Sequence, residues 1–230
     1  PAKAPAAKLV QIRIHGATLH KVEGSYDDAF AAALEYAAQN DCLCRNTAYH
    51  PYTIEGKKTA GLELWLQLGK VPDYIFIPTG DGVILTGIYK AFVDLKRCEF
   101  IDTMPVLIAA QSESSDAITS YHETGIYRDA LSPATIADSI SVRTPSAAAW
   151  AVQALRETSG FGIRVRDTEI LAAQKVLAQR CGIFCEPSSS ATLAAMYKAR
   201  EQGKLQAGKS VVLMLTGHGL KDIQAVKFDA

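Results

Sequence analysis

The chain has 230 residues, of which 48% are hydrophobic, enough for one large core or two unequal ones. Its 24 basic residues balance 24 acidic ones, so charge favours neither nucleic acid nor a membrane surface as a partner. No apolar run approaches the roughly 18 residues of a membrane-spanning helix, and a small-molecule partner is expected instead.

The five cysteines are an odd number, which is typical of a reducing compartment, so we expect a cytoplasmic protein. Cys42 and Cys44 form one close pair, and Cys181 and Cys185 form another. Neither pair has the further cysteine or histidine neighbours that would complete four zinc ligands. The sequence therefore predicts no metal site.

Residues 1–49 are predicted to form a small α/β domain. The patterns predict a helix over Ala6–His15, a strand over Ala17–Val22 and a short strand over Asp41–Arg45. Between the two strands, Ser25 is expected to cap a helix that runs to about Gln39.

Residues 50–230 are predicted to form a larger α/β domain, because strand and helix patterns alternate there. Such alternation predicts a mainly parallel sheet flanked by helices. The predicted strands are Tyr74–Ile77, Pro105–Ala110, Ile163–Val165, Ile183–Cys185 and Val211–Leu215. The predicted helices are Gly56–Leu68, Gly82–Lys96, Asp116–Glu123, Pro145–Glu157, Asp167–Arg180 and Ser188–Gln202, while 131–143 is expected to cross the surface.

A glycine-bearing turn, Pro78 to Gly82 (P-T-G-D-G), joins the first of these strands to a helix. Backbone N–H groups and the positive end of the helix dipole make such a turn suitable for an anion. A plain strand-to-helix turn has the same composition, so the turn alone leaves both readings open.

A second motif, Thr216 to Gly219 (T-G-H-G), follows the last predicted strand. Small residues and one hydroxyl at a strand end let a flat ligand approach the backbone closely. An ordinary turn after a strand is again the alternative.

Four segments together resemble the threonine synthase family of fold-type II enzymes, which use pyridoxal 5′-phosphate (PLP). Leu215–Asp222 resembles the family's C-terminal cofactor motif, and Pro78–Gly82 takes the place of its phosphate loop. Arg45–Thr59 resembles N-S-x-N-P-Y-R-I-E-G-Q-K-T, and Glu186–Ala191 resembles E-P-[AS]-[GS]-A-A. The resemblance implies the tryptophan synthase β-like fold, PLP as cofactor, and conversion of O-phosphohomoserine and water to threonine and phosphate.

The resemblance also implies roles for particular residues. Thr216 would face the pyridine nitrogen of PLP, where a neutral hydroxyl does not hold that nitrogen protonated. Glu186 is a candidate neighbour of the pyridine edge, and His218 is expected to shape its loop, with direct proton transfer as the alternative. The predicted phosphate cradle is Gly80, Asp81, Gly82 and Val83, and the predicted substrate contacts are Asn46 and Thr47.

The sequence departs from the family pattern at several positions. Thr53 stands where the family has an arginine near the substrate phosphate, for which Arg45 is a candidate replacement. Val83 and Ile84 stand where many relatives have Gly or Asn, and Asp81 adds a carboxylate near the cofactor phosphate. These changes favour, as an alternative, a paralogue acting on another amino acid, such as an ammonia-lyase or a cysteate synthase-like enzyme.

The family's lysine that forms a Schiff base with PLP lies in an S-x-K-D motif, which this sequence lacks. We therefore expect residues 1–49 to be the remainder of the small domain, and the chain to be the C-terminal part of a longer protein. Its missing N-terminal segment would be a partner, and no catalytic residue is assigned. Alone, the chain should not turn over substrate, and a non-catalytic fragment is the second alternative. The family commonly forms homodimers.

Overall fold

The computed structural model describes residues 1–225, and its centre is a four-stranded parallel sheet with the order β3-β2-β1-β4. The strands are β1 (Tyr74–Pro78), β2 (Val106–Ser112), β3 (Phe161–Val165) and β4 (Val211–Leu213). β1 is buried along its whole length because neighbouring strands and helices enclose it. Its alternate residues therefore pack into two different cores.

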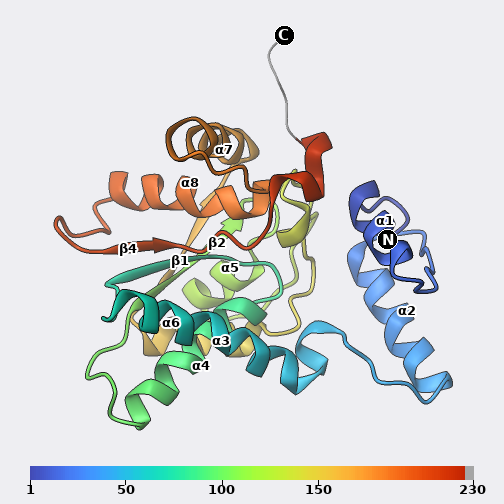
Figure 1. The fold of residues 1–230 in the computed structure, drawn as a ribbon, viewed down its shortest axis with the longest axis horizontal. Coiled ribbons are helices and arrows are strands. Elements are labelled where there is room, and N and C mark those ends of the chain that lie inside the picture. The colour runs from blue at the N-terminus through green and yellow to red at the C-terminus, as the bar shows by residue number, and fades with distance from the viewer. Residues whose placement is uncertain (226–230) are drawn as a thin grey trace.

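Helices cover both faces of this sheet (Figure 1). Phe76 belongs to a core shared with α7 (Asp167–Cys181) and α8 (Pro187–Glu201). Ile75 and Ile77 belong to the opposite core, formed with helices of the other layer. That layer contains α3 (Pro51–Leu68), α4 (Val83–Arg97), α5 (Ala117–Thr124) and α6 (Ala148–Glu157). The fold is thus the predicted α/β layering.

The N-terminal segment (residues 1–49) contains α1 (Ala6–Ile14) and α2 (Tyr26–Gln39) and lies beside the sheet with its flanking helices (residues 50–225), called the sheet domain below (Figure 1). Ser25 caps α2 as predicted: its Oγ accepts from the Asp28 N–H, and the Asp28 carboxylate accepts from the Ser25 N–H at 2.7 Å. The strands predicted over Ala17–Val22 and Asp41–Arg45 are wrong, because these residues form no strand. A strand requires a hydrogen-bonded neighbour, and no strand of the described residues lies alongside them.

Other corrections concern element ends. Residues 183–185 form a single antiparallel bridge, Cys185 with His218, and β4 ends at Leu213. α3 begins at Pro51, because proline fits the first turn of a helix, and α6 begins only at Ala148. Asp167, which was expected to cap the helix reaching about Arg180, is instead the first residue of α7, and Arg166 is its N-cap.

The segment 131–143 does not simply cross the surface, since Ala137, Ile140 and Val142 are buried. Ser115 holds it: the Ser115 hydroxyl donates to the carbonyls of Ile140 (3.0 Å) and Val142 (2.7 Å). The short 3₁₀ helix η2 (Asp138–Ile140) is thereby placed against the sheet.

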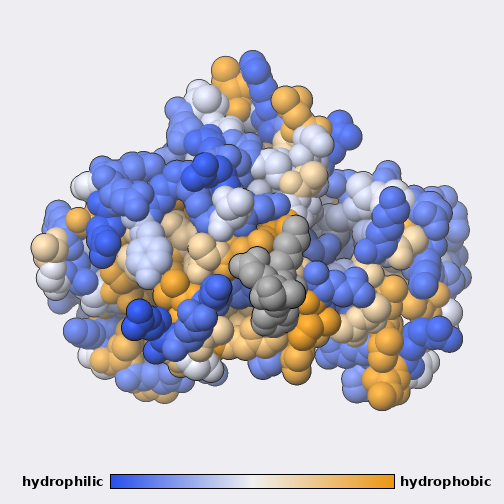
Figure 2. Space-filling model, turned by 90° about the horizontal axis from the view of Figure 1, so that it is seen from above, coloured by the Kyte–Doolittle hydropathy of each residue, from blue (hydrophilic) through white to orange (hydrophobic). Residues whose placement is uncertain are grey.

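Within residues 1–225, no helix has the length and apolarity required to cross a bilayer. Figure 2 shows hydrophilic residues over much of the face seen from above, with hydrophobic residues visible between them.

Candidate functional site

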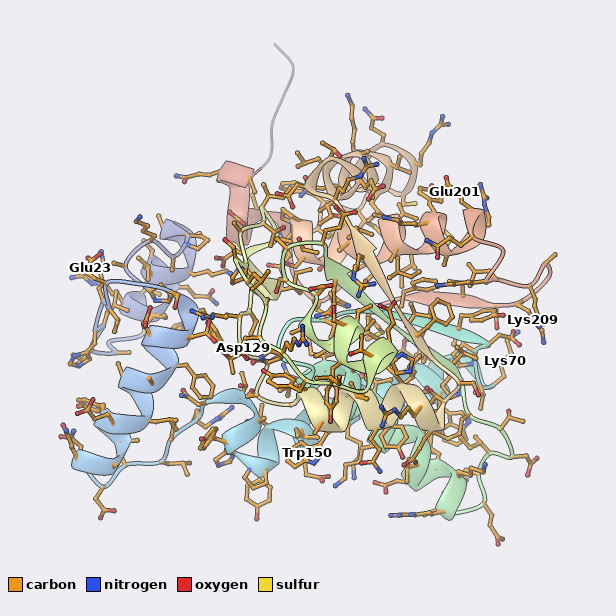
Figure 3. The ribbon with its side chains drawn as sticks, turned by 180° about the vertical axis from the view of Figure 1, so that it is seen from behind. Glu23, Lys70, Asp129, Trp150, Glu201 and Lys209 are labelled. Atoms are coloured by element: carbon orange, nitrogen blue, oxygen red, sulfur yellow. The ribbon has the colours of Figure 1, made fainter. Side chains whose placement is uncertain are left out.

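A pocket of about 200 Å³ lies where β1 and β4 end. Lys70 and Lys209 precede these strands and lie on the side of the molecule away from Glu23 of the N-terminal segment (Figure 3). The C-terminal ends of the strands therefore face the N-terminal segment, and in open parallel sheets ligands bind outside this edge. The pocket wall consists of Arg45, Thr47, Thr53, Lys57, Pro78, Gly80, Asp81, Gly82, Val83, Ile84, Ser139, Ile140, Ser188 and Thr216.

The glycine loop (Thr79 to Gly82) leads from β1 into α4 and forms one wall. Within residues 1–225, the backbone N–H groups of Gly80, Asp81, Gly82 and Val83 donate to no protein acceptor. Gly82 is the N-cap of α4 with φ +86°, and the first turn of this helix contains no acidic residue. Free N–H groups at the positive end of a 15-residue helix form an anion cradle.

Close packing requires glycine at two positions of this loop. A Cβ on Gly80 would lie 3.0 Å from the Ile140 Cα, and one on Gly82 would lie 2.8 Å from the Ala151 Cβ. The positive φ of Gly82 also disfavours any other residue. The two glycines therefore allow the loop to pack closely against η2 and the start of α6.

A buried glutamine that the sequence patterns did not single out holds the glycine loop. The Gln111 side chain donates to the carbonyls of Thr79 (3.2 Å) and Ser115 (3.1 Å). Its carbonyl oxygen accepts from the N–H and the hydroxyl of Thr119, both at 2.8 Å. The sequence offered one indication of this role: Gln111 is a polar residue directly after the apolar run Val106–Ala110.

The Asp81 carboxylate of the glycine loop is bound by three donors. Oδ1 accepts from the Ser146 N–H (3.1 Å) and hydroxyl (3.0 Å), and Oδ2 accepts from the Tyr26 hydroxyl (2.8 Å). Burial, together with the Asp81 charge, raises the pKa of Tyr26 far above its usual range, so Tyr26 remains a donor.

The C-terminal loop (Thr216 to Gly219) brings the Thr216 hydroxyl into the pocket wall. Two hydrogen bonds hold this loop at the start of α8. The Glu186 N–H donates to the Gly217 carbonyl at 2.9 Å, and the Gly217 N–H donates to the Ser189 hydroxyl at 3.0 Å. The His218 Nδ1 accepts from the Leu220 N–H at 3.1 Å, which confirms the predicted loop-shaping role.

Glu186 lies directly behind this loop, because a Cβ on Gly217 would be 2.2 Å from the Glu186 Cδ. Its carboxylate is buried and bonded to the Ser139 hydroxyl (3.2 Å) and the Lys221 Nζ (3.1 Å). Glu186 itself is not among the residues of the pocket wall. The described contacts give it a structural role behind Gly217.

The remaining wall comes from the N-terminal segment and α3. Thr47 lines the pocket, and its hydroxyl lies 3.0 Å from the Ser146 hydroxyl. Asn46 does not line it: its amide donates to the Phe30 carbonyl at 2.8 Å. Thr53 contributes a buried Oγ1 that has no partner within residues 1–225. The pocket thus unites the predicted phosphate cradle with Thr47 and Thr216, whereas Asn46, Glu186 and His218 do not line it.

Two cations, Arg45 and Lys57, also line the pocket. Lys58, the next residue, pairs with Glu55 (3.1 Å) and Asp94 (2.7 Å), whereas Lys57 and Arg45 have no ion-pair partner among the described residues. Lys57 was not singled out from the sequence, because adjacent lysines in a helix do not reveal which one faces a pocket.

A parallel sheet flanked by helices, with free amides after β1 and a hydroxyl after β4, is the arrangement expected of a fold-type II enzyme. A family model described as pyridoxal-phosphate dependent enzyme matches residues 1–217. The chain belongs to this family, whose cofactor is PLP. The predicted resemblance, fold class and cofactor are confirmed.

Curated relatives of the chain include threonine synthases from several organisms. That of Methanosarcina acetivorans is 37% identical over 227 residues, which cover 97% of this chain and 56% of the relative. That of Bacillus sp. (strain ULM1) is 37% identical over 215 residues, covering 94% and 59%. The chain therefore spans little more than half the length of these relatives.

Solved structures show the same fold. A maize serine racemase superposes with a TM-score of 0.77 at 22% identity, covering 95% of this chain and 64% of that one. A processed threonine deaminase from Solanum lycopersicum gives a TM-score of 0.78 at 21% identity, covering 95% and 57%.

Proposed function

We propose that this chain forms the cofactor-phosphate and pyridine side of a PLP-dependent threonine synthase. The complete enzyme would convert O-phosphohomoserine and water to threonine and phosphate. The observation that carries the proposal is one pocket that joins the free amides of residues 80–83 to the Thr216 hydroxyl. The names of the curated relatives support the choice of reaction.

In this proposal the donors fit the cofactor from two sides. The N–H groups of Gly80, Asp81, Gly82 and Val83 bind the PLP phosphate, and the Thr216 hydroxyl faces the pyridine nitrogen. PLP, when bound, withdraws electrons from the bonds at the substrate Cα. Because Thr216 is neutral, it orients the ring without holding the pyridine nitrogen protonated.

The substrate side is proposed to lie at Arg45, Thr47, Thr53 and Lys57, with Asn46 supporting Thr47. Thr53 replaces the family arginine, but the wall contains two cations, Arg45 and Lys57, that have no ion-pair partner within residues 1–225. The first part of the Lys57 side chain packs over α4, since a Cβ on Gly87 would lie 2.4 Å from the Lys57 Cβ. A phosphate-bearing substrate would gain charge-assisted bonds from both cations.

The Schiff-base lysine is proposed to come from a segment of the protein outside these 230 residues. The supporting observation is that no S-x-K-D motif occurs in the 230 residues. The 230-residue chain should therefore bind the cofactor without turning over substrate. An N-terminal segment of the same protein is then its required partner.

Binding of pyridoxamine 5′-phosphate tests the cofactor assignment, because this form has no aldehyde and cannot react with surface lysines. Fluorescence titration of the 230-residue chain should give at least about ten-fold tighter binding than pyridoxamine without phosphate. Thr216→Val should weaken the binding of pyridoxamine 5′-phosphate by a few-fold, because the variant lacks the hydroxyl. Equal affinities for the two ligands would contradict the assignment.

A paralogue acting on another amino acid is the second candidate, favoured by Thr53 in place of arginine. Turnover by a full-length enzyme that contains this chain distinguishes the two. A threonine synthase should release phosphate from O-phosphohomoserine, and Lys57→Gln should raise KM about ten-fold, while the paired Lys58→Gln should not. Turnover of serine or diaminopropionate, but not of O-phosphohomoserine, would support the paralogue. Turnover of none of these three substrates would support a non-catalytic role.

We also propose a cytoplasmic location and a homodimer. The location is supported by five cysteines that are all free in the structure. The dimer rests on family resemblance alone, and sedimentation of the full-length protein would test it.

A further inference from the structure

Asp81 poses an electrostatic problem for the glycine loop. Its backbone N–H is one of the free donors of the anion cradle, yet its side chain brings a negative charge into the same pocket wall. A carboxylate facing a phosphate dianion would repel it, and the repulsion is strong where water is excluded. The cradle can bind a phosphate only if this carboxylate is turned elsewhere.

The structure shows what holds the carboxylate. Ser146, just before α6, donates to Oδ1 through its N–H (3.1 Å) and hydroxyl (3.0 Å). The Ala147 N–H also donates to the Asp81 carbonyl at 3.0 Å, which fixes the backbone of this residue. These donors come from the same domain as the loop.

The remaining oxygen, Oδ2, is held from the N-terminal segment. The Tyr26 hydroxyl donates to it at 2.8 Å across 55 residues of sequence. Tyr26 is the first residue of α2, and its ring packs against Phe30, with the ring centres 6.2 Å apart. A half-buried tyrosine supported in this way presents its hydroxyl in a fixed direction.

We propose that Tyr26 is a positioning residue of the cofactor-phosphate site. Its hydroxyl, with Ser146, keeps the Asp81 carboxylate turned from the phosphate bound by the glycine loop. The affinity for a phosphate-bearing cofactor thereby depends on contact between the N-terminal segment and the sheet domain. This inference rests on the proposed function, since it requires a phosphate at residues 80–83.

Removal of one oxygen atom tests the inference. In the 230-residue chain, Tyr26→Phe should weaken pyridoxamine 5′-phosphate binding by about ten-fold, because the released Oδ2 can turn toward the phosphate. Tyr36→Phe is the matched control, since Tyr36 lies on the same helix and is 49% exposed. It should leave binding unchanged.

A double mutant separates positioning from a general structural effect. Asp81→Asn removes the charge, so Tyr26→Phe added to Asp81→Asn should cause no further loss of affinity. Circular dichroism and the thermal midpoint verify that each variant is folded. An equal loss in both backgrounds, or no loss in Tyr26→Phe alone, would overturn the inference. If the unmodified chain does not bind pyridoxamine 5′-phosphate more tightly than pyridoxamine, the proposed function itself is contradicted, independently of the role of Tyr26.

Discussion

Single side chains decide whether the two loops of the pocket can form. Gly217 has Glu186 behind it, and Gly82 has Ala151 beside it, so neither position has room for a Cβ. Glu186 in turn is buried and forms an ion pair with Lys221. The glycines therefore allow close packing behind the pocket, and any substitution must move a neighbour.

Gly217→Ala should lower the free energy of unfolding by about 1–3 kcal/mol, because the new Cβ would meet the Glu186 carboxylate. The same change should weaken pyridoxamine 5′-phosphate binding through displacement of Thr216. Urea unfolding and ligand titration measure the two effects. Gly56→Ala is the control: it lies in α3 with nothing within 4 Å and should stabilise by about 0.5–1 kcal/mol. An unchanged free energy of unfolding in Gly217→Ala would show that the loop is not tightly packed.

Cys185 should be the least reactive of the five thiols. Burial raises its pKa from 9.0 to about 11, so its thiolate is scarce at pH 8. Because the folded pKa is above the unfolded one, its contribution to stability is complete below pH 9 and is lost as pH rises toward 11. Thiol labelling of the native chain at pH 8 should modify Cys42, Cys98 and Cys181 well before Cys185. Equally fast labelling of Cys185 would contradict its burial.

At the scale of elements, the site depends on side-chain hydrogen bonds between elements that are distant in sequence. Gln111 connects the glycine loop after β1 with β2 and α5, and Ser115 connects the end of β2 with the segment 131–143. Both side chains are buried and fully engaged. The position of the anion cradle is therefore set by several elements together.

Gln111→Leu retains the approximate size of the side chain but removes all of its hydrogen bonds. The carbonyls of Thr79 and Ser115 and the Thr119 N–H would lose partners, at a cost of about 1–3 kcal/mol for each buried unpaired group. A lower unfolding free energy in urea and weaker pyridoxamine 5′-phosphate binding are expected. Gln67→Leu, at an exposed position of α3, should change neither. Unaltered binding in Gln111→Leu would show that the loop holds its shape by itself.

At the scale of the whole molecule, stability is unevenly distributed. α1 contains no buried residue and α2 contains only Ala37, whereas α4 and α8 are buried along one side. The N-terminal segment meets the sheet domain through polar contacts such as Lys8 with Asp138 at 2.6 Å. Few apolar contacts imply easier local opening. The division into domains 1–49 and 50–230 stays a prediction.

Amide hydrogen exchange should therefore be much faster in α1 and α2 than in β1, α4 and α8. Pyridoxamine 5′-phosphate should slow exchange at residues 80–85, where it would occupy free N–H groups. Mass spectrometry of the exchanging chain resolves both regions. Uniform exchange along the chain would show that the N-terminal segment is as stable as the sheet domain.

Much of the local structure was predictable because local physical rules decide it. The apolar run Tyr74–Ile77 predicts a buried strand, and Ser25 with Asp28 starts a helix through bonds between near neighbours. The P-T-G-D-G turn indicates free amides before α4 because helix starts leave such donors unpaired. The family was predicted from the four segments that resemble its motifs, and the cofactor followed from that resemblance.

The sequence by itself determined the α/β layering, the two pocket loops and the family, since each depends on residues close together in the chain. Only the tertiary structure decided that Tyr26 holds Asp81, that Lys57 and not Lys58 faces the pocket, and that Asn46 does not. It also decided that Ala17–Val22 is no strand. These outcomes depend on which distant groups come within hydrogen-bonding distance, and a linear pattern contains no such information.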